Sequence, residues 1–538
     1  MVSFPTFYSS VAVLVSILAY GMPVEAITSV YVQNNTTLTF SVHAVQTGHP
    51  LSKRHCWRQT ASSVAPSQRV QVVWFNRDEG ITNGETFYFT TTLSLPSSSV
   101  LLKQQVRGAL VNSHMWQSLA GPGISHPWYD DNGTHRAIWE LGGRTLRIRY
   151  RAFFTGTDDN IEYIFQEDYT TPRAGPDTLN VLAYNIYMRP TSLFKNGQMI
   201  RARLLPSELR GYDAIIFSEA FDDEARSSLL RGLQAEYPYA TRILGTDRGT
   251  EQDGGVIIVS KYPIEAEDQR LFGSVCAGSD CLADKGVLYA KINKQGRRYH
   301  LFGSHTQAHP SSENASIRRQ QFRIIKTFID SKQIPVHEAV IIGGDLNVDK
   351  MRYLPEFQEM VRILNAEQPR ETGHPYSFDP QTNELAEQGK PSECLDYVLY
   401  SKAHLRPSQA FNEVRMLRSN EEWKEFVWEA ALWDLSDHYA VFGRLEFPGA
   451  PHKVRAEAPP ASASDSRSKR IEYCRQYAEG ALRQISERIE RTGPAPANDP
   501  VWKKDFNHHY NWCLQAPESA STQGSKLRED WLNQHRRK

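Results

Sequence analysis

Carboxylate, amide and imidazole side chains recur at the points where apolar stretches of this chain end. Glu219, the Asn185 carbonyl and Asp437 offer the oxygen ligands that Mg²⁺ prefers, with water and a phosphate completing the coordination shell. A histidine paired with a carboxylate can deprotonate water. These parts together predict phosphodiester hydrolysis, in which a bound cation stabilises the charge that develops at phosphorus. The full set is Asn185, Glu219, Asp253, His305, Asp345, Asn347, Asp396, Asp437 and His438.

The apolar stretches that lead to these residues have the pattern of strands covered on both faces. They read LNVLAYN, AIIFSE, GGVIIVS, YHLFGSH, AVIIGGDLN, LDYVLY and HYAVFGRLEF, and helical segments separate them. We therefore predict an α/β domain over residues 177 to 447, with its site at the strand ends. No Gly-rich phosphate loop or nucleophile-elbow motif stands in a matching context, so we expect no nucleotide cofactor and no serine-hydrolase chemistry.

Seven short motifs of this domain resemble the endonuclease/exonuclease/phosphatase superfamily: AYNIYMRP, IIFSEAFD, DGGVIIVSKYPI, GSHTQA, IIGGDLNVD, LDYVLY and DLSDHYAV. Within that superfamily, YNIYMRP, CAGSDCLADKGVLYAKI and SDHYAV resemble the secreted bacterial neutral sphingomyelinases, phospholipases C that release ceramide and phosphocholine. The resemblance implies a four-layer α/β/β/α sandwich and Mg²⁺ as cofactor, with Mn²⁺ or Co²⁺ as substitutes. It also implies a sphingomyelin-containing membrane surface as the partner.

The same resemblance implies roles for the metal-binding and basic residues. Glu219 would be the central metal ligand, and Asn185 and Asp437 would help to organise the metal and its waters. His438 would be the general base, and Asp396 would orient it.

The resemblance also implies how the phosphate is held. Asp345 and Asn347 would hold the attacked phosphate and the water. His305 would lie on the opposite side, as a phosphate contact or an acid, and Asp253 would be its partner.

An aromatic stretch precedes the SDH motif and includes Trp423, Phe426 and Trp428. Such a cluster in a folded domain is usually core, whereas the resemblance implies an aromatic hairpin that dips into the bilayer, where Trp suits the interface. Several glutamates and a lysine interrupt the aromatics, and this favours exposure. We expect these three residues to contact the membrane, and Trp433 to pack beneath the site.

The N-terminal part of the chain predicts export and a separate β-rich domain. Residues 1 to 26 contain an apolar run followed by small residues, which predicts a cleaved signal peptide and a secreted, extracellular protein. Residues 27 to 170 alternate apolar and polar side chains between turn signals, which predicts a β-sandwich. Its role is either binding and targeting or simple stabilisation. If it dominated, the protein would be an adhesin or lytic binding protein.

The C-terminal part predicts a small helical module. Residues 448 to 470 are rich in Pro, Ala, Ser and charge, as in a flexible linker. Residues 471 to 515 contain two amphipathic segments, which predict a helical hairpin with Cys474 beside Cys513 and a disulfide between them. Residues 516 to 538 are expected to form a polar tail.

Six cysteines in an exported chain permit three disulfides. Cys276 and Cys281 flank a short Gly-containing loop, so we expect them to pair. Cys56 and Cys394 remain, and the sequence leaves open whether they bridge two domains or stay as buried thiols.

The charge balance narrows the range of substrates expected for this site. The 538-residue chain carries 61 basic and 61 acidic side chains, so its formal net charge is zero. A nucleic-acid binder that relies on a general basic surface is therefore disfavoured. Phosphatidylcholine, a phosphoinositide or another phosphodiester remain alternative substrates for the same site.

Overall fold

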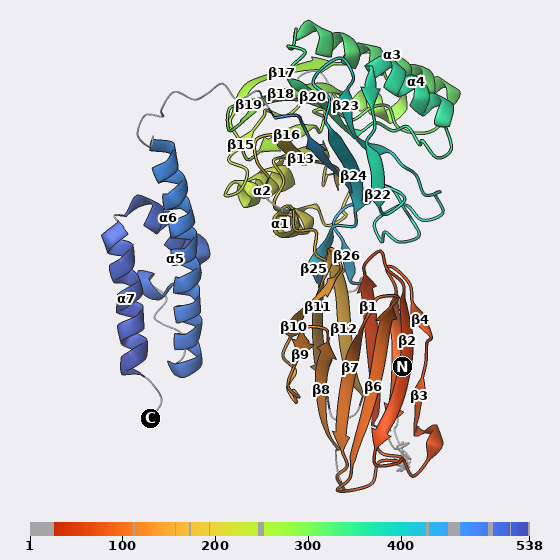
Figure 1. Cartoon of the computed structure of the whole chain (residues 1–538), viewed down its shortest axis with the longest axis vertical. Helices are drawn as coiled ribbons and strands as arrows, with labels where there is room; N and C mark the ends of the chain where they lie inside the picture. The colour runs from red at the N-terminus through yellow and green to blue at the C-terminus, as the bar shows by residue number, and fades with distance from the viewer. Residues whose placement is uncertain are drawn as a thin grey trace, which may run out of the picture. The chain divides into compact units, whose positions relative to one another are not determined.

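The chain forms two compact units, Met1–Gly449 and Ala450–Lys538. The structure is a computed structural model (Figure 1). It describes residues 26–110, 113–155, 158–171, 174–192, 194–245, 252–426, 430–449, 463–492, 499–516 and 518–535. The predicted signal peptide lies outside the described residues, apart from Ala26.

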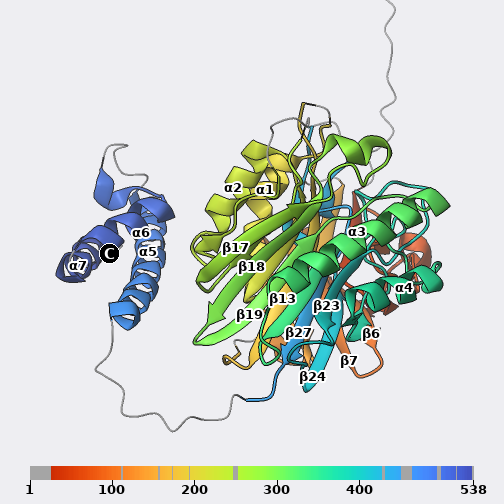
Figure 2. The same ribbon diagram turned by 90° about the horizontal axis from the view of Figure 1, so that it is seen from above.

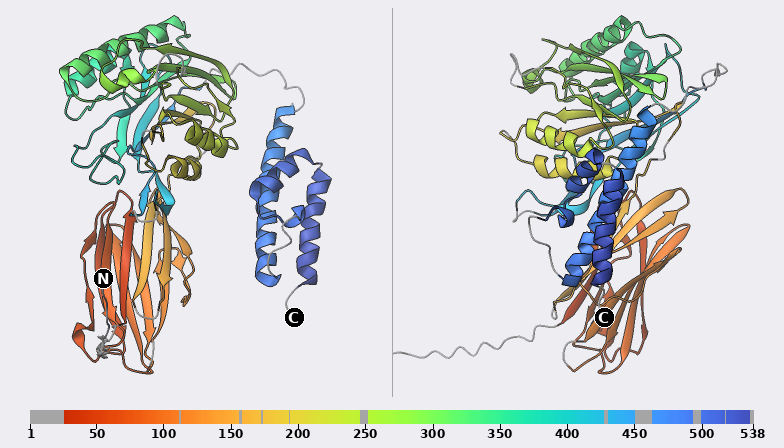
Figure 3. Two further views of the ribbon diagram at one scale, coloured as in Figure 1. Left: turned by 180° about the vertical axis from the view of Figure 1, so that it is seen from behind. Right: turned by 90° about the vertical axis from the view of Figure 1, so that its left-hand side faces the viewer.

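The N-terminal part of the first unit consists of two six-stranded sheets around one core (Figures 1 and 3). In spatial order, one sheet contains β10 (His135–Leu141), β11 (Arg144–Phe153), β12 (Asp159–Glu167), β1 (Ile27–Asn35), β5 (Arg69–Asn76) and β3 (Trp57–Gln59). The other contains β4 (Ser63–Val64), β2 (Phe40–Gly48), β6 (Thr86–Leu95), β7 (Ser98–Arg107), β8 (His114–Gly121) and β9 (Ile124–Ser125).

The alternating sequence pattern explains which face of these strands is buried. Along β11, Leu146, Ile148 and Tyr150 lie in the core, while the arginines between them lie on the outer face. Pairing is antiparallel except where β1 runs parallel to β12. The first and last strands of this part are therefore neighbours.

The remainder of the first unit contains two mixed sheets. In spatial order, the seven-stranded sheet contains β15 (Tyr239–Ala240), β16 (Ile257–Ser260), β14 (Ala214–Ala220), β13 (Thr178–Met188), β27 (Ala440–Glu446), β24 (Gln409–Arg415) and β22 (Arg370–Gly373). The six-stranded sheet contains β17 (Ile264–Leu271), β18 (Gly286–Lys294), β19 (Arg297–Ser304), β20 (Ala339–Asp345), β23 (Asp396–Ser401) and β21 (Ala366–Glu367).

Helices cover the outer face of each of these sheets (Figure 2). α1 (Gln198–Glu208) and α2 (Asp223–Leu233) pack on the seven-stranded sheet, and α3 (Ser312–Ser331) and α4 (Leu354–Leu364) pack on the six-stranded sheet. The inner faces of the two sheets share a third apolar core. The prediction of a mixed α/β domain is confirmed.

Glycines allow close packing directly before the candidate site. A Cβ on Gly343 would lie 3.0 Å from the Ile216 side chain of the facing sheet. A Cβ on Gly344 would lie 2.1 Å from the Ser304 carbonyl oxygen, and Gly344 has a φ of 128°. The two glycines therefore let β20 approach its neighbours closely enough to place Asp345 beside the end of β19.

A short hairpin, β25 (Arg418–Trp423) and β26 (Leu432–Asp434), lies at the seam between the N-terminal sheets and the α/β region (Figure 1). Arg418 is 1% exposed, and its Nε lies 2.8 Å from Asp434 Oδ1. Its Nη2 donates to Ser67 Oγ at 2.7 Å, and its carbonyl accepts from Gln166 at 2.5 Å. One buried guanidinium thus joins the two parts of the unit.

The membrane role expected for Trp423 is wrong. Its indole is 5% exposed, packs in the core beneath α1, and donates from Nε1 to the Asp434 carbonyl at 3.1 Å. Phe426 is half-buried, and Trp428 lies outside the described residues. Trp433 is buried as expected, and the Arg149 guanidinium lies 5.5 Å from its ring centre. Charged residues flank Trp423 because β25 has one exposed face. The charge pattern therefore did not show that the Trp423 side chain is buried on the other face.

The second unit contains α5 (Ala463–Thr492), α6 (Phe506–Gln515) and α7 (Glu518–Gln534). The predicted disulfide between Cys474 and Cys513 is confirmed, and both residues are buried. Two boundaries differ from the prediction: α5 begins inside the expected linker, and the expected polar tail forms α7. Leu532 and Arg528 of α7 are buried, and Arg528 donates to Gln484 of α5 at 2.9 Å. Partner contacts of this kind stabilise a helix whose own sequence is largely polar.

Candidate active site

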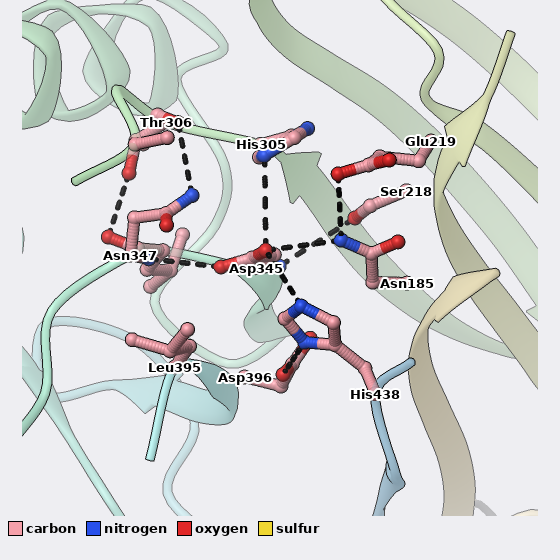
Figure 4. Close-up of polar contacts among 12 residues, drawn as sticks. Asn185, Ser218, Glu219, His305, Thr306, Asp345, Asn347, Leu395, Asp396 and His438 are labelled. Atoms are coloured by element: carbon pink, nitrogen blue, oxygen red, sulfur yellow. Dashed lines mark hydrogen bonds and ion pairs between the residues drawn. The ribbon is translucent and has the colours of Figure 1, made fainter. Parts of the chain in front are cut away.

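Strand ends from both sheets of the α/β region bring the predicted residues together (Figure 4). β13 supplies Asn185 and β14 supplies Glu219, while the other sheet supplies Asp345 at the end of β20 and Asp396 at the start of β23. His438 directly precedes Tyr439 and β27. Figure 4 shows Asp345 between the imidazoles of His305 and His438.

The Asn185 side chain links the carboxylates of the two sheets. Its Nδ2 donates to Glu219 Oε1 at 3.2 Å and to Asp345 Oδ2 at 3.1 Å. The backbone carbonyl oxygen of Asn185 accepts from Ser436 Oγ at 2.6 Å, two residues before His438. Asn185 therefore fixes the spacing of the acidic groups through its side-chain amide, and it contacts the SDH segment through its backbone carbonyl.

His438 and Asp396 form a buried pair. His438 Nδ1 lies 2.7 Å from Asp396 Oδ2, and His438 Nε2 lies 3.9 Å from Asp345 Oδ2. Burial by itself lowers the pKa of His438, but the charges of Asp396, Asp437 and Asp345 raise it well above its usual value. The carboxylate at Nδ1 leaves Nε2 as the nitrogen that faces the other acidic groups.

His305 lies on the other side of Asp345, next to a lysine that the sequence interpretation missed. Lys285 Nζ lies 3.3 Å from His305 Nε2 and donates to Asp280 Oδ2 at 2.9 Å. Burial, then the charges of Lys285 and His438, lower the pKa of His305 well below its usual value. Both effects favour the neutral imidazole, whose Nε2 can accept a hydrogen bond from the ammonium group.

A disulfide lies beside this lysine. The predicted bond between Cys276 and Cys281 is confirmed, and Asp280 lies inside the small ring that it closes. The signal for Lys285 was present in the sequence, because the lysine follows that ring in the motif CAGSDCLADKG. By contrast, Cys56 and Cys394 are buried thiols with no disulfide between them.

Asp253 does not pair with His305, contrary to expectation. Its Oδ2 lies 3.0 Å from Arg226 Nη1 and its Oδ1 accepts from the Gly255 amide at 2.9 Å. His305 Nδ1 is buried and has no hydrogen-bond partner in the described part of the chain. The arginine that binds Asp253 comes from α2, and spacing along the chain gave no sign of this contact.

Asn347 continues the site beyond Asp345. Its backbone amide donates to Asp345 Oδ1 at 3.0 Å, and its Nδ2 donates to the Thr306 carbonyl at 3.1 Å. Asn347 and Glu219 both have positive φ values, 51° and 54°. Such backbone strain in non-glycine residues is concentrated at functional sites, where the surrounding structure holds it.

The acidic groups fit a hard divalent cation. Burial raises the pKa of Asp345 to about 7, and the nearby charge of Asp396 adds to this. Burial likewise raises the pKa of Asp437 to about 7, where His438 opposes the shift and the charge of Glu219 supports it. An ion with oxygen preference would relieve this repulsion, and Glu219, Asp437 and Asn185 supply only oxygen ligands.

Comparisons with known proteins agree with this geometry. Residues 182–438 match the Endonuclease/Exonuclease/phosphatase family. A phospholipase C of Staphylococcus aureus is 40% identical over 288 residues, which cover 49% of this chain and 86% of the relative. A sphingomyelinase C of Bacillus cereus is 36% identical and is covered to 96% of its length.

The chain belongs to the endonuclease/exonuclease/phosphatase family, together with the bacterial sphingomyelinases C. It is a metal-dependent phosphodiesterase of this family. A crystal structure of Staphylococcus aureus beta toxin with bound magnesium ions is 37% identical, covers 49% of this chain and 98% of its own, and has a TM-score of 0.46. Among the described residues, no helix has the length and apolar character needed to cross a membrane.

Proposed function

We propose that the protein hydrolyses sphingomyelin to ceramide and phosphocholine, with His438 as the general base and Mg²⁺ as the metal. The observation that carries the mechanism is the 2.7 Å contact between His438 Nδ1 and Asp396 Oδ2, next to an all-oxygen ligand set. The substrate is proposed from the names of the relatives, which are called sphingomyelinase C and phospholipase C.

Asp396 prepares His438 for proton transfer. A carboxylate at Nδ1 fixes the tautomer whose Nε2 lone pair accepts a proton from water, and it stabilises the imidazolium that results. The high pKa of His438 in the protein alone comes from the surrounding carboxylates. A bound cation would offset their charge and lower this pKa, which would favour the neutral imidazole.

Glu219, Asn185 and Asp437 would hold the metal, which supplies a Lewis acid for the charge that develops on the phosphate. Asp345 and Asn347 would orient the water and the phosphate from the neighbouring strand. His305 would contact a phosphate oxygen, and Lys285 would keep it neutral and in place. Asp345 lies between both histidines, so its hydrogen bond to Asn185 sets their separation from the metal ligands.

Phosphocholine release separates the candidate substrates. We expect hydrolysis of sphingomyelin vesicles in Mg²⁺, slower hydrolysis of phosphatidylcholine, and loss of both in EDTA. Equal or faster turnover of phosphatidylcholine would reject the substrate and keep the metal-dependent site. Turnover that survives EDTA would reject the site itself.

We also propose three domains: a β-sandwich over residues 27 to 170, a four-layer α/β/β/α phosphodiesterase domain over 177 to 447, and a disulfide-stapled helical module that contains α5, α6 and α7. Separate apolar cores in each part support this division. Secretion, with a sphingomyelin-containing membrane as the partner, is proposed from the predicted signal peptide and from the relatives.

A further inference from the structure

A groove of about 400 Å³ lies at the seam, away from the active-site residues. The outer faces of β10, β11 and β12 line one side of it, and Asn420 and Glu421 of β25 line the other. Arginines dominate its charge, because Arg136, Arg147 and Arg149 line it against the single carboxylate of Glu421. The groove therefore lies between the N-terminal sheet and β25, and its lining carries a net positive charge.

Two of these arginines lie opposite each other on neighbouring strands of the same sheet. Arg136 of β10 is the register partner of Arg149 of β11, and Arg151 follows on the same face. Like charges directly opposite one another destabilise a sheet. Burial, and then the charge of Arg151, lower the pKa of Arg149. The arrangement costs stability, so a compensating function is expected for it.

Their neighbours are paired, whereas this pair is not. Arg147 Nη2 lies 2.8 Å from Glu208 Oε2, and Arg151 Nη2 lies 3.3 Å from Glu422 Oε1. Over the described ranges, neither Arg136 nor Arg149 has an ion pair or a side-chain hydrogen bond.

The position of Arg149 is nevertheless defined, because its guanidinium lies over the ring of the buried Trp433. Arg147 contributes a further unused donor, since its Nε is buried without a partner. Stacking on a buried ring holds a guanidinium in place without using its hydrogen-bond donors.

We propose that this groove binds a phosphate-type oxyanion, either as the headgroup of an acidic lipid or as a free ion. Guanidinium groups match the geometry of phosphate oxygens and bind them through paired hydrogen bonds. Ile138, which is 49% exposed, lines the same groove and would contact an apolar part of the ligand. The site is separate from the proposed catalytic residues, so it does not depend on the identity of the substrate.

Vesicle binding without turnover tests the site. The full chain is mixed, in EDTA, with vesicles of phosphatidylcholine alone or of phosphatidylcholine with phosphatidylglycerol, both free of sphingomyelin. We expect binding only to the acidic vesicles, and about fivefold weaker binding for Arg136→Gln or Arg149→Gln. Arg298→Gln is the matched control, because it removes an exposed charge of the α/β region that is paired with Glu265.

A second measurement distinguishes the free ion from the lipid. Inorganic phosphate should raise the melting temperature of the wild-type protein but not that of the two groove variants. If phosphate acts in this way and acidic vesicles do not bind, the groove takes a free oxyanion. If acidic vesicles bind as predicted, it takes the headgroup.

Folding and activity serve as controls for the same variants. Arg136→Gln should keep or raise the melting temperature without phosphate, because it removes a like-charge contact. Hydrolysis of a soluble phosphocholine ester should stay unchanged. The proposal is overturned if phosphate has no effect and the groove variants bind acidic vesicles as tightly as wild type. It is equally overturned if Arg298→Gln weakens binding as much as they do.

Discussion

Two buried clusters of carboxylates in the first unit differ in how their negative charge is balanced. At the seam, Asp434 and Glu384 are accompanied by the buried guanidinium of Arg418. At the active site, Asp345 and Asp437 form no ion pair with any lysine or arginine of the described residues. An arginine of the chain balances the first cluster, whereas histidines lie beside Asp345 in the second, an arrangement that fits a cation supplied from outside.

Their electrostatics show the same contrast. Burial, followed by the charge of Asp434, raises the pKa of Glu384 to about 7, while Arg418 opposes that shift. Near the active site, Arg201 is fully buried, but its guanidinium donates to backbone carbonyls, among them Ile186 at 2.7 Å and Leu435 at 3.0 Å. Arg418 thus forms an ion pair with a carboxylate of its cluster, whereas Arg201 bonds to the backbone beside the active site.

The largest effect is expected from Glu219→Gln, which removes the charge of the central metal ligand at constant volume. Hydrolysis should fall by about 10³-fold or more, because metal stabilisation of the transition state is worth several kcal/mol. Steady-state assays at saturating Mg²⁺ measure this, with Glu313→Gln as a charge-matched control on α3. Turnover near that of the wild type would show that Glu219 is not the central metal ligand.

His438→Ala should lower kcat by about 10² to 10⁴-fold, since this is the usual contribution of a general base. Asp396→Asn should cause a smaller loss, because the imidazole remains but loses its orienting carboxylate. The assay uses a soluble phosphocholine ester, with chemistry shown to be rate-limiting. The exposed His337→Ala serves as control, and a loss below about threefold for His438→Ala would remove it from the mechanism.

At the seam, Arg418→Met should lower the free energy of unfolding by about 3 to 5 kcal/mol, because Asp434 is left buried and unpaired. Urea unfolding measures the change. Adding Asp434→Asn should recover part of the loss, since the uncompensated charge is then removed. An Arg418→Met protein as stable as the wild type would show that the two clusters do not differ in the way described.

Mg²⁺ should stabilise the fold by about 2.7 kcal/mol at a hundredfold excess over its Kd. The raised pKa values of Asp345 and Asp437 set the pH dependence. The folded metal-free protein keeps protons on these groups between about pH 4 and pH 7, where the unfolded chain has lost them, so their contribution to stability falls as pH rises.

Mg²⁺ competes with those protons, so its stabilising increment should be larger near pH 8 than near pH 5. Melting temperatures with Mg²⁺ and with EDTA measure this, and Asp437→Asn should reduce the increment. An increment that is the same at both pH values would argue against these carboxylates as the cation site.

The sequence predicted the active-site cluster better than the cluster of Asp434, Glu384 and Arg418 at the seam. Strand-end residues such as Asn185, Asp345 and His438 stand out because polar groups directly follow apolar runs, and the strands then bring them together. Both disulfides were predictable because short loops and paired helical faces limit which cysteines can meet.

The remaining contacts were not predictable because they join residues far apart in sequence through side chains. Arg226 of α2 forms an ion pair with Asp253, and Arg418 donates a hydrogen bond to Ser67 across the seam. Trp423 has charged neighbours on both sides, yet its own side chain packs under α1. Local charge patterns report the exposed face of a strand and not the partner that covers the other face.

The parallel pairing of β1 with β12 has a consequence for the order in which the protein folds. Thr28 lies beside Asp159, so synthesis from the N-terminus must pass about 130 residues before the first strand finds this neighbour. Such high contact order slows folding and leaves an edge of β1 uncovered in the nascent chain. β12 also provides Gln166, which binds the Arg418 carbonyl. β12 thus pairs with the first strand of the chain and also contacts the α/β region.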